Sequence, residues 1–259
     1  MSLRRLTLSA LLLSCCAACQ PAAIGKDAGN SGDAASDGIA NLPAVHAVLH
    51  WENRLSGDNP ETKTYYLNMK TCRDVGWTVH ELSPQDVAKL GTGRVEIRID
   101  RRQQRITETH WTLGGGDPAT TAGICSPRLI EDHRVEEAAP GQGYYLPLES
   151  DPDGEKKLQA SLGWTFVGED QVQGQPCKRW RSDKYEVCTW SGGRQWGFSD
   201  APVNMIACLD SSGADYLTEI PLAGKPAGDS GCIVRLESFS LGKGLLPDNL
   251  PAASDKGTH

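Results

Sequence analysis

Alternating apolar and polar residues mark several short strands along the 259-residue chain. Residues 95–99 read Val-Glu-Ile-Arg-Ile, the two-residue period of a strand with one buried face. A polar turn at 101–104 follows, and residues 105–113 contain threonine and tryptophan, which favour strands. We therefore predict a β-hairpin here. Further strands are predicted at 166–167, 185–187 and 233–236, with glycine-rich breaks at 114–116, 141–143 and 192–193.

Helix signals are scarce. Residues 84–90 form one candidate helix, because Ser83 is a suitable N-cap and Pro84 suits the first helical position. Residues 153–160 form a second candidate. The pattern as a whole predicts an all-β or β-dominated α+β fold, with antiparallel sheets, few short helices and disulfide bonds.

The N-terminus has the features of an export signal. Arg4 and Arg5 form a basic start, residues 6–13 are mostly apolar, and small residues precede Cys19. Small residues directly before a cysteine resemble the lipobox of bacterial lipoproteins, whose cysteine is diacylated and becomes the mature N-terminus. We favour Cys19, because it leaves a longer apolar region than the alternative, Cys15. An ordinary signal peptide or an uncleaved anchor remain alternatives.

Composition divides the chain into four segments. Residues 1–18 form the signal peptide, and residues 19–41 form a lipidated tether too poor in large apolar residues to fold. Residues 42–246 form a β-rich globular body, and residues 247–259 form a disordered tail. The body is one domain or two related halves. The tripeptide Gly-Trp-Thr occurs at 76–78 and 163–165, and Tyr-Tyr-Leu at 65–67 and 144–146, but the offsets differ and favour chance similarity.

Charge and the lipobox type indicate where the protein acts. Removing Arg4 and Arg5 with the signal changes the net charge from −7 to −9, which argues against nucleic acid as a partner. An acidic chain also offers no basic patch for anionic lipids, so we expect the protein to bind the membrane through its N-terminal lipid. In bacterial lipoproteins an aspartate after the lipidated cysteine often retains the protein in the inner membrane. Gln20 follows Cys19 here, so the resemblance implies an outer-membrane lipoprotein facing the periplasm, with a soluble periplasmic or secreted protein as the alternative.

Six cysteines in the body predict disulfide bonds, because an even number in an exported protein is typical of them. An antiparallel hairpin centred between Ser182 and Asp183, with a four-residue loop over 181–184, would place Cys177 opposite Cys188. It would also place Arg179 opposite Glu186 and Trp180 opposite Tyr185, on alternating faces, with Trp190 sharing the face of Arg179. Proximity pairs Cys208 with Cys232, and elimination leaves Cys72 with Cys125.

No catalytic, cofactor or metal motif emerges. Gly228-Asp229-Ser230-Gly231 matches the core of the trypsin-type nucleophile motif, but these residues are turn formers and nothing marks a histidine as their base. Residues 151–155 resemble part of a calcium loop without its closing glutamate. The six histidines are scattered, and the cysteine spacing does not suit zinc. We expect no cofactor and no enzymatic activity.

Tryptophan and arginine gather between residues 164 and 196. Both residue types are enriched where proteins bind partners, although tryptophan also fills β-rich cores, which is the favoured interpretation. The candidate binding residues are Arg179, Trp180, Trp190, Arg194 and Trp196.

Residues 172–190 loosely resemble strands of curved-sheet envelope proteins of the lipoprotein-carrier type. The resemblance implies a curved antiparallel sheet with an apolar ligand groove. We therefore expect a cell-envelope lipoprotein that acts as a binding or scaffolding module for an apolar or glycan ligand. A protein-binding inhibitor or immunity-type protein with an envelope partner is the alternative, and an envelope hydrolase is a third.

Lipidation is directly testable. We expect Cys19 to carry a diacylglyceryl group and the protein to partition with membranes, because two or more acyl chains hold a protein firmly where one does not. Intact-mass analysis of the mature N-terminus is the measurement. Acylation at Cys15 would move the site and keep the class, whereas an unmodified N-terminus in the soluble periplasmic fraction would contradict the prediction.

Overall fold

The computed structural model describes residues 43–100, 104–115, 121–138, 152–193, 206–209, 217 and 219–242. The segments predicted at 1–18, 19–41 and 247–259 lie outside these residues.

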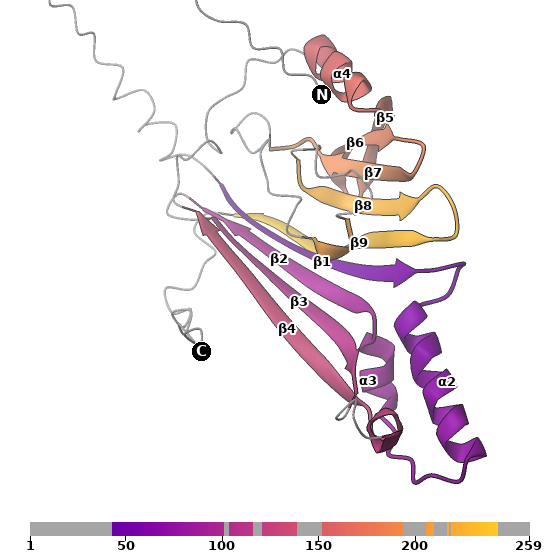
Figure 1. Ribbon diagram of the computed structural model, residues 1–259. Coiled ribbons are helices and arrows are strands. Elements are labelled where there is room, and N and C mark those ends of the chain that lie inside the picture. Colours follow the sequence, from indigo (N-terminus) through magenta and orange to yellow (C-terminus); the bar gives the residue numbers. More distant parts are fainter. Residues whose placement is uncertain are drawn as a thin grey trace, which may run out of the picture.

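The described part is β-dominated, which confirms the predicted fold class (Figure 1). Its elements are β1 (Ala44–Arg54), α2 (Pro60–Asp74), α3 (Pro84–Lys89), β2 (Thr92–Ile99), β3 (Gln104–Gly114), the 3₁₀ turn η1 (Thr121–Cys125), β4 (Arg128–Ala138), α4 (Pro152–Ser161), β5 (Thr165–Val172), β6 (Gln175–Arg181), β7 (Tyr185–Trp190), the 3₁₀ turn η4 (Ala207–Leu209), β8 (Pro221–Pro226) and β9 (Gly231–Gly242).

The strands form one nine-stranded antiparallel sheet in the order β4-β3-β2-β1-β9-β8-β7-β6-β5. Two meanders, β1 to β4 and β5 to β9, join where β1 pairs with β9, from Ala44 opposite Gly242 to Arg54 opposite Gly231. In Figure 1, α2 and α3 lie at one end of the β1–β4 strands, and α4 lies beside β5. The hairpin predicted over residues 95–113 is present as β2 and β3.

Local capping explains the helices. The Ser83 hydroxyl accepts a hydrogen bond from the backbone N–H of Asp86 and Pro84 opens α3, as the sequence predicts. The predicted helix over 153–160 is α4. The longest described helix, α2, was not predicted, because its buried stripe of Tyr65, Met69 and Cys72 is narrow and gives a weak periodic signal. Its N-terminus is capped by Asn59, whose side chain accepts from the N–H groups of residues 61 and 62.

The recurring Gly-Trp-Thr tripeptide ends a helix at both of its positions. After α2, Gly76 adopts a positive φ of 76°, and the N–H groups of Gly76 and Trp77 bond the carbonyls of Arg73 and Cys72. After α4, Gly163 has a φ of 86°, and the corresponding bonds run from residues 163 and 164 to residues 160 and 159. Both are the paired-bond C-cap that favours glycine. The repeat therefore marks a shared local structure at the two helix ends.

One continuous core draws on both meanders and mostly on one face of the sheet, with Cys177, Cys188 and Trp190 joining it from the other face. Trp51 of β1 is 2 % exposed, and its indole lies where a side chain at position 93 would sit, so that β2 carries Gly93 there. Its ring nitrogen donates to the buried Glu108 carboxylate of β3 at 2.9 Å. A smaller cluster of Tyr65, Met69, Val87 and Leu90 fixes α2 and α3.

The three predicted disulfides are present: Cys72–Cys125, Cys177–Cys188 and Cys208–Cys232. The predicted register of the 177–188 hairpin, however, is wrong by two residues. Cys177 lies opposite Trp190, Arg179 opposite Cys188 and Trp180 opposite Val187. The disulfide therefore bridges diagonal positions, with Cα atoms 5.5 Å apart, within the normal span of such bonds.

A tighter turn causes the register difference. The Ser182 N–H donates to the Tyr185 carbonyl at 2.8 Å, and the Ser182 hydroxyl accepts from the Tyr185 N–H at 3.0 Å. These bonds close a two-residue turn at Asp183 and Lys184 in place of the expected four-residue loop. A shift of two residues preserves the strand faces, so Trp180, Tyr185 and Val187 still share one face, and all three belong to the core.

The disulfides differ in the length of the loop that they close, which predicts different contributions to stability. Cys72–Cys125 spans 53 residues and Cys177–Cys188 spans 11. Loop-closure entropy gives about 4 kcal/mol for the first and about 3 kcal/mol for the second. We expect Cys72→Ala/Cys125→Ala to lower the free energy of unfolding more than Cys177→Ala/Cys188→Ala does, as measured by urea titration. A larger loss from the hairpin pair would contradict this.

Candidate functional site

The candidate site is an open groove of about 540 Å³ that crosses strands β5 to β9. This volume lies within the usual range of ligand pockets. Strand register places the groove on the face opposite the buried side chains of Val187 and Val234. Cys188 pairs with Ala223 and Ala223 pairs with Arg235, whereas Val187 and Val234 both lie opposite Gly224 on the other face and belong to the core. We call this surface "the groove".

Small and branched apolar groups form the floor of the groove. Ala223 lies at its middle, beside Cys188 of the disulfide, and Ile233 and Val172 continue the floor toward β9 and β5. Ala223 makes the groove deeper at this point, because the residues opposite it on the two neighbouring strands, Cys188 and Arg235, have longer side chains. None of the described residues that line the groove is aromatic.

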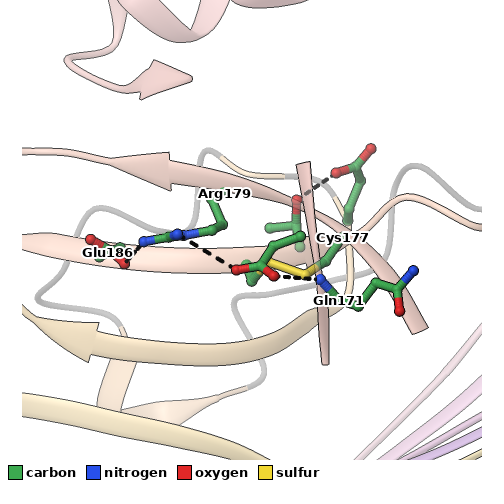
Figure 2. The surroundings of a disulfide bond; sticks show 8 residues. Gln171, Cys177, Arg179 and Glu186 are labelled. Carbon is green, nitrogen blue, oxygen red and sulfur yellow. Dashed lines mark hydrogen bonds and ion pairs between the residues drawn. A yellow bond between two sulfur atoms is a disulfide. The ribbon is translucent and has the colours of Figure 1, made fainter. Parts of the chain in front are cut away.

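Charged side chains form the rim. Arg179 donates to Glu186 at 2.7 Å and lies 3.5 Å from Asp170 (Figure 2). Arg181 donates two further hydrogen bonds to the other Glu186 oxygen, at 2.8 and 3.0 Å. Hydrogen bonds from Arg179 first, and then from Arg181, hold the pKa of Glu186 below its usual value. The Glu186 carboxylate in turn raises the pKa of the Arg179 guanidinium.

Two more cations, Lys225 of β8 and Arg235 of β9, line the groove and are exposed. Neither forms an ion pair with any residue that the structure describes. The rim therefore combines a neutralised arginine–carboxylate cluster at one end with two uncompensated positive charges at the other.

The structure separates the predicted binding residues. Arg179 lies at the groove, but Trp180 and Trp190 are 1 % and 0 % exposed and belong to the core, in line with the favoured core interpretation. Trp190 lies opposite Cys177, so the register keeps it on the face of Arg179 as predicted. It is buried there against Phe239, with ring centroids 4.9 Å apart. Arg194 and Trp196 lie outside the described residues.

Sequence reasoning missed most of the groove. Ile233 and Arg235 alternate within a predicted strand, so their shared face could be read from the sequence. Ala223 and Lys225 could not, because β8 has prolines at both ends and a central glycine and does not resemble a strand. Only the pairing of β8 with β7 and β9 brings these side chains beside Arg179 and Cys188.

The other sequence motifs have structural roles. Gly228-Asp229-Ser230 connects β8 to β9, where the Ser230 hydroxyl accepts from the Ser56 N–H at 2.8 Å and the Asp229 carbonyl accepts from Gly57 at 2.7 Å. Within the calcium-like segment, Glu155 accepts from Lys178 at 2.6 Å. Among the described residues, no three histidine, cysteine, aspartate or glutamate side chains gather as a metal site would require.

A second, smaller cavity of about 210 Å³ lies where α4 meets β5 and β6. Beside it, Lys178 lies between two carboxylates, 2.6 Å from Glu155 and 3.6 Å from Glu219. Thr189 donates to Glu219 at 2.5 Å. This partly buried cluster fastens α4 to the sheet, and the cavity is smaller than most ligand pockets.

No protein-family model matches the chain, and no curated protein is similar to it in sequence. Within the described residues, every helix is too short or too polar to cross a lipid bilayer.

The Glu186 cluster predicts a specific pH dependence of stability. A lowered folded-state pKa stabilises the fold above the unfolded pKa, about 4.3, and this stabilisation is lost as the pH falls through the folded value. We expect Glu186→Gln to lower the free energy of unfolding by about 1 kcal/mol at pH 7 and by much less at pH 3. Urea titrations at both pH values measure the difference.

Glu169→Gln is the matched control, because Glu169 is exposed on β5, two strands away in the same sheet, and forms no ion pair with the described residues. It should change stability little at either pH. A Glu186→Gln effect that is equally large at pH 3 would show that the carboxylate charge is not what stabilises the groove rim.

Proposed function

We propose that this protein is a cell-envelope lipoprotein whose β-sheet body binds an apolar ligand in the groove. The observation that carries the proposal is a groove of about 540 Å³ with an apolar floor, on the sheet face opposite the buried side chains of Val187 and Val234. The proposed anchor is lipid on Cys19, with Cys15 as the alternative, in the outer membrane facing the periplasm. Such an anchor would hold the groove close to a supply of apolar molecules.

The composition of the groove favours an apolar ligand over a glycan. Proteins commonly hold sugars against exposed tryptophan or tyrosine rings, and the described lining has no such ring. Trp164, Trp180 and Trp190, the tryptophans that the structure describes in this half of the chain, are all buried. Ala223 and Ile233 offer only aliphatic contact, and burying an alkyl chain on such a surface contributes up to about 0.8 kcal/mol per methylene.

The same geometry suits binding better than acid–base chemistry. Glu186 is held ionised by two arginines, whereas a general acid or base works best with a pKa near the working pH. Asp170 also lies beside Arg179. We therefore do not propose a hydrolase.

Binding to an envelope protein is the second candidate. Three apolar side chains near the C-terminal end of α2 are notably exposed: Val75 at 53 %, Trp77 at 41 % and Ile124 at 41 %. The Cys72–Cys125 disulfide fixes this region, since it joins α2 to η1. A rigid exposed surface with a tryptophan is typical of protein interfaces.

The ligand proposal is tested with neutral single-chain amphiphiles. We expect dodecyl maltoside to bind the purified full-length protein more tightly than decyl maltoside, both below their micelle concentrations, in isothermal titration calorimetry. Each added methylene should lower Kd by about threefold, somewhat less than full burial would give because the groove is open. Ala223→Phe should abolish binding by filling the middle of the floor.

Thr107→Phe is the matched control, because residue 107 lies on β3, on the same sheet face and outside the groove. Both substitutions add an aromatic residue to a strand, where it is well tolerated. Equal affinity for the two chain lengths, or equal loss in both variants, would contradict the proposal.

A further inference from the structure

The charges around the groove are unevenly compensated although the chain as a whole is acidic. It carries 33 acidic and 26 basic residues, so there are enough carboxylates to pair with every lysine and arginine. Yet Lys225 and Arg235 form no ion pair with the described residues, and both line the groove.

The nearest carboxylates are all held by other arginines. Glu186 lies directly opposite Lys225 in the β7–β8 ladder but bonds Arg179 and Arg181 instead. On the other side, Glu52 lies opposite Ile233 on β1 and accepts from Arg54 at 2.9 Å.

Glu237, two residues beyond Arg235, lies 3.4 Å from Arg94. Each local acid is thus engaged away from the two cations. The protein keeps a positive site where neutralising partners were within reach.

Register places the two cations around the apolar floor. Ala223 lies opposite Arg235, and the same antiparallel pairing places Lys225 next to Ile233. Lys225 and Arg235 are therefore diagonal neighbours on one face of the sheet, at a Cα spacing of about 7–8 Å. Two long cationic side chains at this spacing can both reach one oxyanion. These two cations and the two apolar residues, Ala223 and Ile233, form the corners of a square on β8 and β9, in which Ala223 and Ile233 occupy the other diagonal.

We infer that the groove binds a single-chain amphiphile with an anionic oxyanion headgroup, a carboxylate or a phosphate, held between Lys225 and Arg235. The alkyl chain lies on Ala223 and Ile233 and extends toward Val172. This inference rests on the proposed apolar-ligand function and adds the charge of the ligand. Charge-assisted hydrogen bonds from lysine and arginine are the strongest that proteins offer to such headgroups.

The test compares headgroups on one chain length. Calorimetry with the purified full-length protein in low salt measures dodecyl phosphate, dodecanoate and dodecyl maltoside, each below its micelle concentration. We expect dodecyl phosphate to bind at least about tenfold more tightly than the maltoside, and dodecanoate to lie between them. The advantage of the phosphate should shrink in high salt, since exposed charges are screened.

Single substitutions locate the headgroup. Lys225→Gln and Arg235→Gln should each weaken dodecyl phosphate binding about fivefold and leave dodecyl maltoside unchanged. Lys184→Gln is the matched control, because Lys184 is an exposed lysine in the β6–β7 turn outside the groove. It removes the same net charge and should leave both affinities unchanged.

The possible outcomes separate the two claims. Equal affinity for the phosphate and the maltoside, or an equal effect of Lys184→Gln, overturns the inference and leaves the apolar-ligand proposal standing. Binding of neither amphiphile overturns both. Inorganic phosphate that displaces dodecyl phosphate at similar concentration would show a small-anion site and would overturn the amphiphile assignment.

Discussion

The pairing of the first and last described strands is the constraint on which the rest of this structure depends. β1 and β9 are paired along almost their whole length at the centre of the sheet, from Ala44 opposite Gly242 to Arg54 opposite Gly231. Without this ladder the two meanders would be separate sheets, each with an additional open edge. With it, one core covers both, and β9 brings Ile233 and Arg235 beside β8.

The two faces of the sheet then take different roles. Large rings such as Trp51 and Trp180 are buried in the core on one face, where Trp51 lies over Gly93 and its ring nitrogen donates to Glu108. The opposite face of the second meander keeps small aliphatic groups in the middle and charge at the rim. A surface with apolar and cationic parts side by side is physically matched to an amphiphile with a negative headgroup, which explains why we favour such a ligand over a glycan.

Local features could be predicted from the sequence, whereas the strand order and the groove could not. The long-range Cys72–Cys125 bond was reached only by elimination. The β2–β3 hairpin and the α3 cap depend on neighbouring residues, and both were predicted correctly. The Cys177–Cys188 pair was found as well, but its register was not, because the side chain of Ser182 closes a tighter turn than the symmetry of the sequence indicates.

The site followed the same rule. Arg179 was picked out as a candidate from the tryptophan- and arginine-rich segment around it, and the core interpretation favoured for the neighbouring tryptophans is confirmed for Trp180 and Trp190. β8, with Ala223 and Lys225, gains its strand character only from its two neighbours in the sheet. The groove is thus a product of non-local pairing, which hydrophobic periodicity does not encode.

Methyl-resolved NMR of the protein titrated with dodecyl phosphate tests the central claim most directly, because it reports where the ligand lies. The account predicts that the methyl resonances of Ala223, Ile233 and Val172, which form the floor of the groove, shift together and saturate at one ligand per protein. Shifts confined to Val75 and Ile124 beside Trp77, or no shift at the three floor residues, would contradict it.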